Sequence, residues 1–332
     1  MREPRFWSVD VDPRSREAAP LTRFLLSPIS WIYGYLTAHR IKNTEPTRIS
    51  SKVICVGNLT AGGVGKSPVV SHLRELISET FDKRTASLSH GYKGREKSPL
   101  FVDFATHTAI DVGDEPLMLS ASGESWIGAD RAEAGAAMDL EGVNVIVMDD
   151  GHQNPTLHKD FSFVVVDSEA RFGNGFIIPK GPLREPIIAG LSRADAVIVM
   201  GSDQRPPELQ GYSGPVLFAK IKPSRAPLPH KYVAFAGIGR PEKMFESLIT
   251  AGAELADSVP FPDHHTYTKD DLSFLRQLAT DNEAKLITTE KDYARLKADE
   301  RENILTFPVE VEFDDPDLLL GLIRSVIEQE PS

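Results

Sequence analysis

The residues best suited to chemistry form a glycine-rich loop between a predicted strand and a predicted helix. The loop consists of Thr60, Ala61, Gly62, Gly63, Val64, Gly65, Lys66 and Ser67. Glycines let a backbone approach a phosphate closely, and the N–H groups at a helix start attract its negative charge. Lys66 would reach the β- and γ-phosphates, and the Ser67 hydroxyl is a ligand for Mg²⁺. Thr60 stands where the usual pattern has Gly, but the strand–loop–helix context favours a nucleotide triphosphate site over a coincidental turn.

A pair of carboxylates follows a later apolar run. Asp149 and Asp150 come directly after EGVNVIVM at 141–148. In P-loop proteins a carboxylate at such a strand end holds the Mg²⁺ that bridges the β- and γ-phosphates. An aspartate at this position is often only a turn former, so the metal-binding interpretation depends on the glycine-rich loop upstream.

Two other segments offer groups that could activate a hydroxyl. Asp114 lies in VGDEP, and His264 and His265 lie in FPDHH. A carboxylate can accept a proton from an attacking hydroxyl, and a nearby imidazole can tune that reaction toward neutral pH. Asp114 could instead cap a helix that begins at Glu115. The histidines could be ordinary loop residues or metal ligands, although adjacent histidines cannot readily face one metal.

The elements that position these residues follow from alternating apolar runs and helical patterns. Near-continuous apolar runs are typical of buried parallel strands, and their alternation with helices predicts a doubly wound α/β fold. Strands are predicted at 51–58, 141–150, 161–167 and 194–201, with a helix at 67–81.

A polar segment with three prolines, 222–231, predicts a linker. After it, strands at 232–239, 284–290 and 304–313 alternate with helices near 241–251, 269–280 and 315–328. The predicted domains are an N-terminal membrane-associating helical segment at 1–45, a P-loop nucleotide-binding domain at 46–225, and a smaller C-terminal α/β domain at 226–332.

The N-terminal helical segment contains an uncharged stretch, 24–39, bounded by Arg23 and Arg40. Its sixteen residues fall short of the roughly 20 that span a bilayer. Its polar or small positions fall on one helical stripe and leave a broad apolar face. An amphipathic helix on a membrane surface and a helix packed on its own domain both fit this pattern. The chain start, MREPRFW, does not resemble a cleaved secretory signal.

Composition narrows the function classes. With 332 residues, of which 41% are hydrophobic, the chain is long enough for about two packed domains. Its net charge of −11 argues against a protein that coats nucleic acid. Residues 1–50 nevertheless carry eight Lys/Arg against five Asp/Glu, which suits anionic lipid. The single cysteine, Cys55, cannot form an internal disulfide, so a reducing compartment is expected.

Taken together, these segments resemble the tetraacyldisaccharide 4′-kinases, the lipid A pathway kinases of Gram-negative bacteria. The resemblance covers most of the chain and is carried by eight motifs in order: GNLTAGGVGKSP (57–68), LSHGYKG (88–94), VGDEP (112–116), DDGHQN (149–154), PKGPLRE (179–185), FAGIGRPEKMF (235–245), PDHHTY (262–267) and TTEKDYARL (288–296). It implies a P-loop kinase fold of two α/β/α domains joined by a hinge.

The resemblance also implies an activity and its residues. The γ-phosphate of ATP would pass to the 4′-hydroxyl of a tetraacyl glucosamine disaccharide 1-phosphate, forming lipid IV-A in lipopolysaccharide biosynthesis. Asp114 and His264 would be the catalytic dyad, and Lys66 would act on the phosphates. Ser67, Asp149, Asp150 and Glu185 would surround Mg²⁺, and Tyr92, Arg131 and Arg184 would line the nucleotide or substrate phosphates. The partners would be the lipid substrate and the cytoplasmic face of the inner membrane, with no nucleic acid and no obligate protein partner.

The sequence departs from the commoner family pattern at His90, His152 and Asn154, which weakens any role for those three positions. Two other functions stay open at this point. One is a membrane-associated ATPase switch of the septum-site and partition type, whose KGGVGKT motif is close to AGGVGKS. That class has a signature lysine where this chain has Ala61. The other is a soluble small-molecule kinase whose N-terminal helix belongs to its core.

Overall fold

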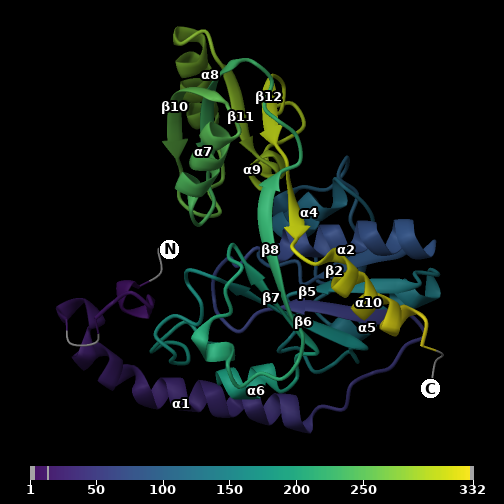
Figure 1. Ribbon diagram of the computed structural model, residues 1–332. Helices are drawn as coiled ribbons and strands as arrows, with labels where there is room; N and C mark the ends of the chain where they lie inside the picture. The colour runs from purple at the N-terminus through teal and green to yellow at the C-terminus, as the bar shows by residue number, and fades with distance from the viewer. Residues whose placement is uncertain (1–3, 13–14, 330–332) are drawn as a thin grey trace.

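The computed structural model describes residues 4–12 and 15–329, which form a larger and a smaller α/β lobe (Figure 1). The larger lobe is built on a nine-stranded sheet in the order β13-β8-β7-β6-β1-β5-β2-β4-β3. The strands from β8 to β4 in this order are parallel, and antiparallel β13 and β3 close the two edges. The strand bounds are β1 Lys52–Gly57, β2 Thr85–Ser89, β3 Leu100–Phe101, β4 Ser125–Ile127, β5 Val145–Asp149, β6 Phe161–Asp167, β7 Ala196–Met200, β8 Val216–Pro223 and β13 Val309–Phe313.

Helices cover both faces of this sheet because its central strands are apolar on both sides. Ile54 and Val147 pack with helices α2 and α10 on one face. Val53 and Ile146, one residue earlier on the same strands, pack with α5 on the other face. The alternation along each strand explains the uninterrupted apolar runs and confirms the predicted doubly wound α/β fold. The larger-lobe helices are α2 Lys66–Phe81, α3 Ala109–Val112, α4 Asp114–Ser120, α5 Arg131–Leu140, α6 Ile187–Leu191 and α10 Pro316–Ile327, with 3-10 turns at Arg5–Trp7, Arg16–Ala18 and Pro207–Leu209.

The smaller lobe is a four-stranded parallel sheet in the order β10-β9-β11-β12 with its own core. Helix α7 packs through Phe245 and Leu248 in one apolar cluster, and α8 packs through Leu272 and Leu275 in another. Its elements are β9 Lys231–Ala236, α7 Pro241–Thr250, β10 Glu254–Pro260, α8 Lys269–Asp281, β11 Lys285–Thr289, α9 Glu290–Arg295 and β12 Ile304–Phe307.

The end of the chain differs from the predicted domain organisation. The run 304–313, predicted as one strand of the smaller domain, divides at Pro308 into β12 and β13. Strand β13 pairs with β8 in the larger sheet, and α10 buries Leu319 and Ile323 in the larger lobe's core. Proline has no N–H to donate to a strand ladder, which favours a break there. Residues 309–327 therefore complete the larger lobe, and not the smaller domain predicted at 226–332.

The N-terminal helix α1, Pro20–Asn43, lies along the larger lobe at the end away from the smaller lobe (Figure 1). Its Ser30 and Gly34 are buried, and the Ser30 hydroxyl donates to the Ile177 carbonyl at 2.6 Å. The opposite side is apolar and exposed, with Phe24 74% and Trp31 75% accessible. The predicted small-residue stripe therefore packs on the protein and leaves the apolar face open. None of the helices in the described ranges is long and apolar enough to cross a membrane.

The two lobes touch on two sides of different character. On one side α9 packs against α4, and Ala294 is buried with Val112 and Leu117 of the larger lobe. On the other side Glu169 pairs with Arg240 at 3.0 Å and with Lys243 at 2.7 Å, all three at the surface. The first contact is apolar and buried, and the second is ionic and exposed.

Candidate functional site

The glycine-rich loop connects β1 to the first turn of α2, as predicted. Gly65 has φ +83° immediately before the helix, a left-handed conformation that glycine adopts without steric cost. The first half of the loop is held in place by the backbone N–H of Ala61, which donates to the Pro182 carbonyl at 2.7 Å. A Cβ on Gly63 would meet no atom within 4 Å, so space is open around it. The structure thus places a glycine loop with open space at a helix N-terminus, as a phosphate site requires.

Lys66 faces the carboxylates at the end of β5. Its Nζ lies 3.2 Å from Asn58 Oδ1 and 3.4 Å from Asp150 Oδ1. Arg184 donates to the same Asp150 oxygen at 2.8 Å. Burial alone would raise the pKa of Asp150. The charges of Lys66 and Arg184 and their hydrogen bonds outweigh burial, so the pKa of Asp150 is lowered. The strand pairing of β1 with β5 explains this meeting, because the two carboxyl ends lie at one edge of the parallel sheet.

Asp149, the other acid at the end of β5, is almost fully buried. Its carboxylate is 4% exposed, and Oδ1 has no hydrogen-bond partner in the described part of the chain. Burial raises the pKa of Asp149 to about 7, although Lys66 opposes that rise. An orphaned buried carboxylate oxygen beside a phosphate loop is chemically suited to a bound divalent cation.

Glu185 does not offer a free carboxylate in this arrangement. Both of its oxygens accept from Arg193 Nη2 at 2.7 Å, and Oε1 also accepts from Gln153 Nε2 at 2.9 Å. Across residues 4–12 and 15–329, no three His, Cys, Asp or Glu residues form a group that could hold a metal by themselves.

The three residues predicted to line the phosphates have different surroundings. Arg184 lies at the site through its bond to Asp150. Arg131 is 3% exposed, and its Nη1 contacts His90 Nδ1 at 3.2 Å. Burial lowers the pKa of Arg131, while Asp149 and Asp150 act to raise it. Tyr92 is 60% exposed and makes a cation–π contact with Lys93. Only Arg184 is thus fixed against the carboxylates by a direct bond.

Asp114 and His264 meet across the boundary between the lobes. His264 Nδ1 lies 2.7 Å from Asp114 Oδ2, although 150 residues separate them in sequence. Asp114 is the first residue of α4, and the N-cap position before it is occupied by Gly113. Its carboxylate is therefore directed at the imidazole, and the alternative of a simple helix cap is not what the structure shows.

The ionisation of Asp114 is set by its neighbours in the smaller lobe. Burial opposes its negative charge, but the hydrogen bond from His264 and the charge of Arg295 prevail and lower the pKa of Asp114 to about 2. His265, the adjacent candidate, is turned away and contacts Asp271 at 3.0 Å. Of the two histidines, His264 is the one that reaches the predicted carboxylate.

Several residues around the site carry no role in the sequence analysis. Arg295 Nε donates to Asp114 Oδ2 at 2.9 Å, and Lys291 Nζ contacts Glu115 at 2.7 Å. Asn58 and Gln153 connect the loop to the acidic segment, since Gln153 Nε2 donates to the Asn58 carbonyl at 2.9 Å. These residues lie in the motifs GNLT, DDGHQN and TTEKDYARL, but the spacing within a motif does not reveal these partners.

The departures at His152 and Asn154 have structural explanations. His152 is 2% exposed and its Nε2 lies 2.9 Å from the Gly190 carbonyl. Burial lowers the pKa of His152 to about 4, so it is neutral near pH 7. The Asn154 side chain accepts from the N–H and the hydroxyl of Thr156. The two side chains thus hydrogen-bond to nearby parts of the protein, His152 to the carbonyl of Gly190 and Asn154 to Thr156.

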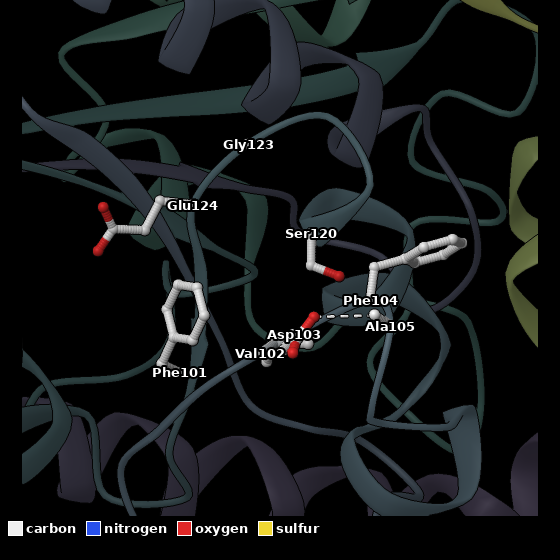
Figure 2. A pocket seen from close by; sticks show the side chains of 8 residues that line it. All are labelled: Phe101, Val102, Asp103, Phe104, Ala105, Ser120, Gly123 and Glu124. Atoms are coloured by element: carbon white, nitrogen blue, oxygen red, sulfur yellow. Dashed lines mark hydrogen bonds between the residues drawn. The ribbon is translucent and has the colours of Figure 1, made fainter.

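A separate pocket of about 430 Å³ lies near the edge of the larger sheet (Figure 2). It is lined by Phe101, Val102, Asp103, Phe104, Ala105, Ser120, Gly123 and Glu124. Asp103 Oδ1 accepts from the Ala105 N–H within this lining at 2.9 Å. No residue predicted to bind nucleotide, metal or hydroxyl is among these eight, so this pocket is distinct from the candidate site.

Comparisons with known proteins agree with the arrangement. Residues 22–328 match the family described as tetraacyldisaccharide-1-P 4′-kinase, LpxK. A tetraacyldisaccharide 4′-kinase of Hyphomonas neptunium is 51% identical over 329 residues, covering 99% of each chain. One of Maricaulis maris is 48% identical over 335 residues, covering 99% of this chain and 97% of the relative. The crystal structure of the apo form of LpxK from Aquifex aeolicus in complex with ATP has the same fold. Its TM-score is 0.73 at 24% identity, covering 92% of this chain and 99% of that one.

Proposed function

The chain belongs to the tetraacyldisaccharide-1-P 4′-kinase family, and we propose that it carries out this phosphoryl transfer with residues of both lobes. The γ-phosphate of ATP passes to the 4′-hydroxyl of a tetraacyl glucosamine disaccharide 1-phosphate, which gives lipid IV-A. The observation that supports our site most directly is the 2.7 Å contact between Asp114 and His264 across the lobe boundary. The full-length similarity to kinases of this name does not favour the ATPase switch.

The nucleotide binds at the glycine-rich loop in this proposal. The N-terminus of α2 and the loop N–H groups face the phosphates, and Lys66 and Arg184 supply positive charge. In the structure Lys66 Nζ is 3.4 Å and Arg184 Nη1 is 2.8 Å from Asp150 Oδ1. That carboxylate therefore holds them at the site before any phosphate arrives, which reduces the reorganisation needed in the transition state.

Mg²⁺ fits the acidic end of β5. The buried, unpartnered Oδ1 of Asp149 is the group that supports this assignment best. Asp149, Asp150 and the Ser67 hydroxyl would hold the ion, with Glu185 ordering Arg193 and Gln153 beside them. When bound, the ion would neutralise charge on the β- and γ-phosphate oxygens. Substituting Asp149 by Asn should therefore weaken the magnesium dependence of ATP binding.

Asp114 and His264 form the base that receives the hydroxyl proton. Asp114 Oδ2 is already occupied by His264 Nδ1 and by Arg295. The other ring nitrogen of His264, Nε2, has no hydrogen-bond partner among the residues described and is 3.8 Å from Asp263. We therefore assign proton acceptance to His264 Nε2, with Asp114 orienting the ring and stabilising its charged form. The two groups are coupled, so kinetics would report the pair.

Helix α1 is the element by which the enzyme would reach a substrate with acyl chains. Its exposed apolar residues include Leu21, Phe24, Leu25, Ile29, Trp31 and Tyr35. An amphipathic helix with such a face lies in the interface of a bilayer, and basic residues near its ends favour anionic lipid. This would place the protein as a peripheral enzyme on the cytoplasmic face of the inner membrane.

The experiment that tests the proposed function is transfer of labelled γ-phosphate from ATP to the tetraacyl disaccharide 1-phosphate. Lys66→Ala should abolish most of the labelled lipid while the protein remains folded. Labelled lipid formed equally by both proteins would exclude the glycine-rich loop as the nucleotide site. ATP hydrolysis that needs no acceptor lipid, with no labelled lipid formed, would refute the kinase assignment.

A further inference from the structure

The Asp114 carboxylate has a second partner from the smaller lobe besides His264. Arg295 places Nε 2.9 Å and Nη2 2.8 Å from Asp114 Oδ2, the oxygen that also contacts His264 Nδ1. The guanidinium is 3% exposed, and its Nη2 is 3.4 Å from the imidazole Nδ1. One buried cation thus lies against both members of the proposed base.

We propose that Arg295 is a positioning residue for the phosphoryl transfer, and that it fixes Asp114 of the larger lobe against His264 of the smaller lobe. This inference rests on the proposed role of the Asp114–His264 pair. The contacts of Arg295 are with Asp114, with the imidazole of His264 and with its own lobe, and the residues proposed to hold nucleotide and metal are not among them.

Arg295 can act in this way because the smaller lobe holds it rigidly. Its Nη1 donates to Asp292 Oδ1 at 2.6 Å and to the Gly237 carbonyl at 2.6 Å. Gly237 O also accepts from the backbone N–H of His264 at 3.1 Å. The guanidinium and the histidine therefore share one anchor, so a movement of the lobes would leave their separation unchanged.

The anchor is itself buried and fully bonded. Asp292 is 0% exposed, and its carboxylate accepts from the Gly237 N–H, the Tyr267 hydroxyl and the Thr289 hydroxyl. A Cβ on Gly237 would come within 3.2 Å of Asp292 Oδ1 and the Pro262 carbonyl, so this position favours glycine. Such a network has little freedom to rearrange, which is what a positioning role requires.

The shape of the guanidinium explains why arginine suits this position. One side chain directs Nη1 at Asp292 and directs Nε and Nη2 at Asp114. A lysine has one charged atom and cannot hold both carboxylates in the same planar arrangement. Arg295→Lys therefore preserves the charge but loses one of the two contacts.

The charges that face Asp114 come from three elements. Arg295 and Lys291 lie on α9, His264 lies in the loop after β10, and Glu115 is the neighbouring acid on α4. Removing the positive charge of Arg295 makes protonation of the coupled pair easier. The pair would then lose its proton-accepting form at a higher pH than in the wild type.

The test compares Arg295→Met and Arg295→Lys with wild type in the phosphate-transfer assay from pH 5 to 9. We expect Arg295→Met to lower kcat by about 100-fold, the cost of misplacing a catalytic group, with KM for ATP within about twofold. The acid limb of its kcat profile should move to higher pH. Arg295→Lys should restore part of kcat and return the acid limb toward that of wild type.

Arg301→Met is the matched control. Arg301 also reaches across the same side of the lobe boundary, where its guanidinium lies 4.1 Å from the Phe104 ring centroid, but it does not contact Asp114. It should keep kcat and the pH profile of wild type. Equal losses of kcat in Arg295→Met and Arg301→Met would overturn the inference. It would also be overturned if Arg295→Met changed kcat and KM together while the acid limb of its pH profile stayed at the wild-type pH.

Two further measurements keep the inference separable from folding and from the proposed function. If circular dichroism shows that Arg295→Met is unfolded, the test relies on Arg295→Lys. An unchanged kcat in Arg295→Lys would then overturn the inference. Asp114→Ala is measured in the same assay. Full activity of Asp114→Ala would refute the proposed function of the pair, whereas an inactive Asp114→Ala beside fully active Arg295 variants would refute only the role of Arg295.

Discussion

At the scale of single residues, the site depends on side chains whose backbone and partners leave little freedom. Asp150 and His264 both have left-handed φ angles, +55° and +58°. For histidine this region is strained, and strain of about 1–3 kcal/mol persists only where surrounding bonds enforce it. Here the His264 N–H bond to Gly237 and the ring contact with Asp114 do so. The backbone thus directs the imidazole toward the carboxylate before a substrate binds.

Replacing Asp114 by alanine tests the catalytic pair directly. We expect turnover to fall by up to about 10²–10⁴-fold, the usual contribution of general base catalysis, because without Asp114 the imidazole of His264 is neither oriented nor stabilised in its charged form. The affinity for ATP should change little, because Asp114 does not contact the glycine-rich loop. Single-turnover phosphate transfer and equilibrium ATP binding separate the two quantities. Comparable losses in both would indicate that Asp114 is a structural residue.

The low pKa of Asp114 predicts a pH-dependent stability. Its pKa is about 2 in the folded protein and about 3.8 ordinarily, so folding favours the ionised form. The stabilisation, on the order of 2 kcal/mol, is present above about pH 4 and is lost as the pH falls toward 2. The difference in unfolding free energy between wild type and Asp114→Asn should therefore shrink over that range. A difference that stays constant down to pH 2.5 would contradict this assignment.

The local motifs were predictable, and the network behind them was not. Lys66, Asp150 and Asp114 could be selected because glycine loops, strand ends and short acidic motifs have local patterns. Arg295 was not selected, because its role comes from two partners that lie 181 and 58 residues away in the sequence. Glu185 was expected to contact metal, but nothing local shows that Arg193 would occupy both of its oxygens.

At the scale of secondary-structure elements, α1 shows how a helix of 24 residues can pack on the protein and still present an apolar face to its surroundings. Its buried side is formed by small residues, which let the helix approach the body of the lobe closely. A Cβ at Gly34 would lie only 3.0 Å from the Ile177 side chain. Because the contact with the protein uses the narrow side, the large apolar side chains remain outside.

Charging the exposed face of α1 should weaken membrane binding without unfolding the protein. We expect Phe24→Glu combined with Trp31→Glu to reduce co-flotation with vesicles of anionic phospholipid by at least about tenfold, because each residue loses buried apolar area and gains charge. Leu140→Glu is the control, since Leu140 is an 89% exposed leucine on α5. Equal flotation of all three proteins would argue that α1 is not the membrane contact.

Helix α10 is the element whose place in the fold was predicted wrongly. Its apolar pattern was visible at 315–328, but periodicity gives the buried face of a helix and not the sheet that it covers. Likewise the run 304–313 reads as one strand until Pro308 is seen to separate two sheets. The strands at 161–167 and 285–289 were easier, because a buried parallel strand needs only its own apolar run.

Two neighbouring leucines test the packing of α10 on the larger lobe. Leu319 is fully buried, and Leu318 is 38% exposed. Leu319→Ala should lower the unfolding free energy by about 2–5 kcal/mol, because it leaves a cavity. Leu318→Ala should cost less than about 1 kcal/mol. Urea unfolding of both variants measures the difference, and equal costs would place α10 elsewhere.

At the scale of the whole molecule, the lobes are joined by one firm and one weak contact. The α9–α4 side buries apolar residues, which favours a fixed pivot. The Glu169 side has ion pairs at the surface, and Arg240 also lies 3.6 Å from the partly buried Asp167; surface pairs of this kind contribute little in water. The hinge remains a prediction, and this asymmetry indicates that any opening would begin at Glu169.

Closure of the lobes should accompany substrate binding. Spin labels at Leu140→Cys and Phe274→Cys would report the distance between the larger and smaller lobes, since both positions are exposed. The native Cys55 is buried, and burial raises the pKa of its thiol to about 11, so it should not react with the label. We expect an ATP analogue and the lipid together to narrow the distance distribution. If the distribution of distances between the labels stayed unchanged, closure of the lobes would not be required for substrate binding.

The return of the chain to β13 makes the smaller lobe an insertion within the larger one. Val309 pairs with Pro223, so the inserted segment leaves and re-enters at neighbouring residues (Figure 1). During translation, the whole insertion must therefore be synthesised before β13 and α10 can join the larger lobe. During that interval the apolar surface under α10 is open to chaperones. Because these two ends are neighbours, a short turn could replace residues 224–308. The larger lobe could then be produced as a protein without the smaller lobe.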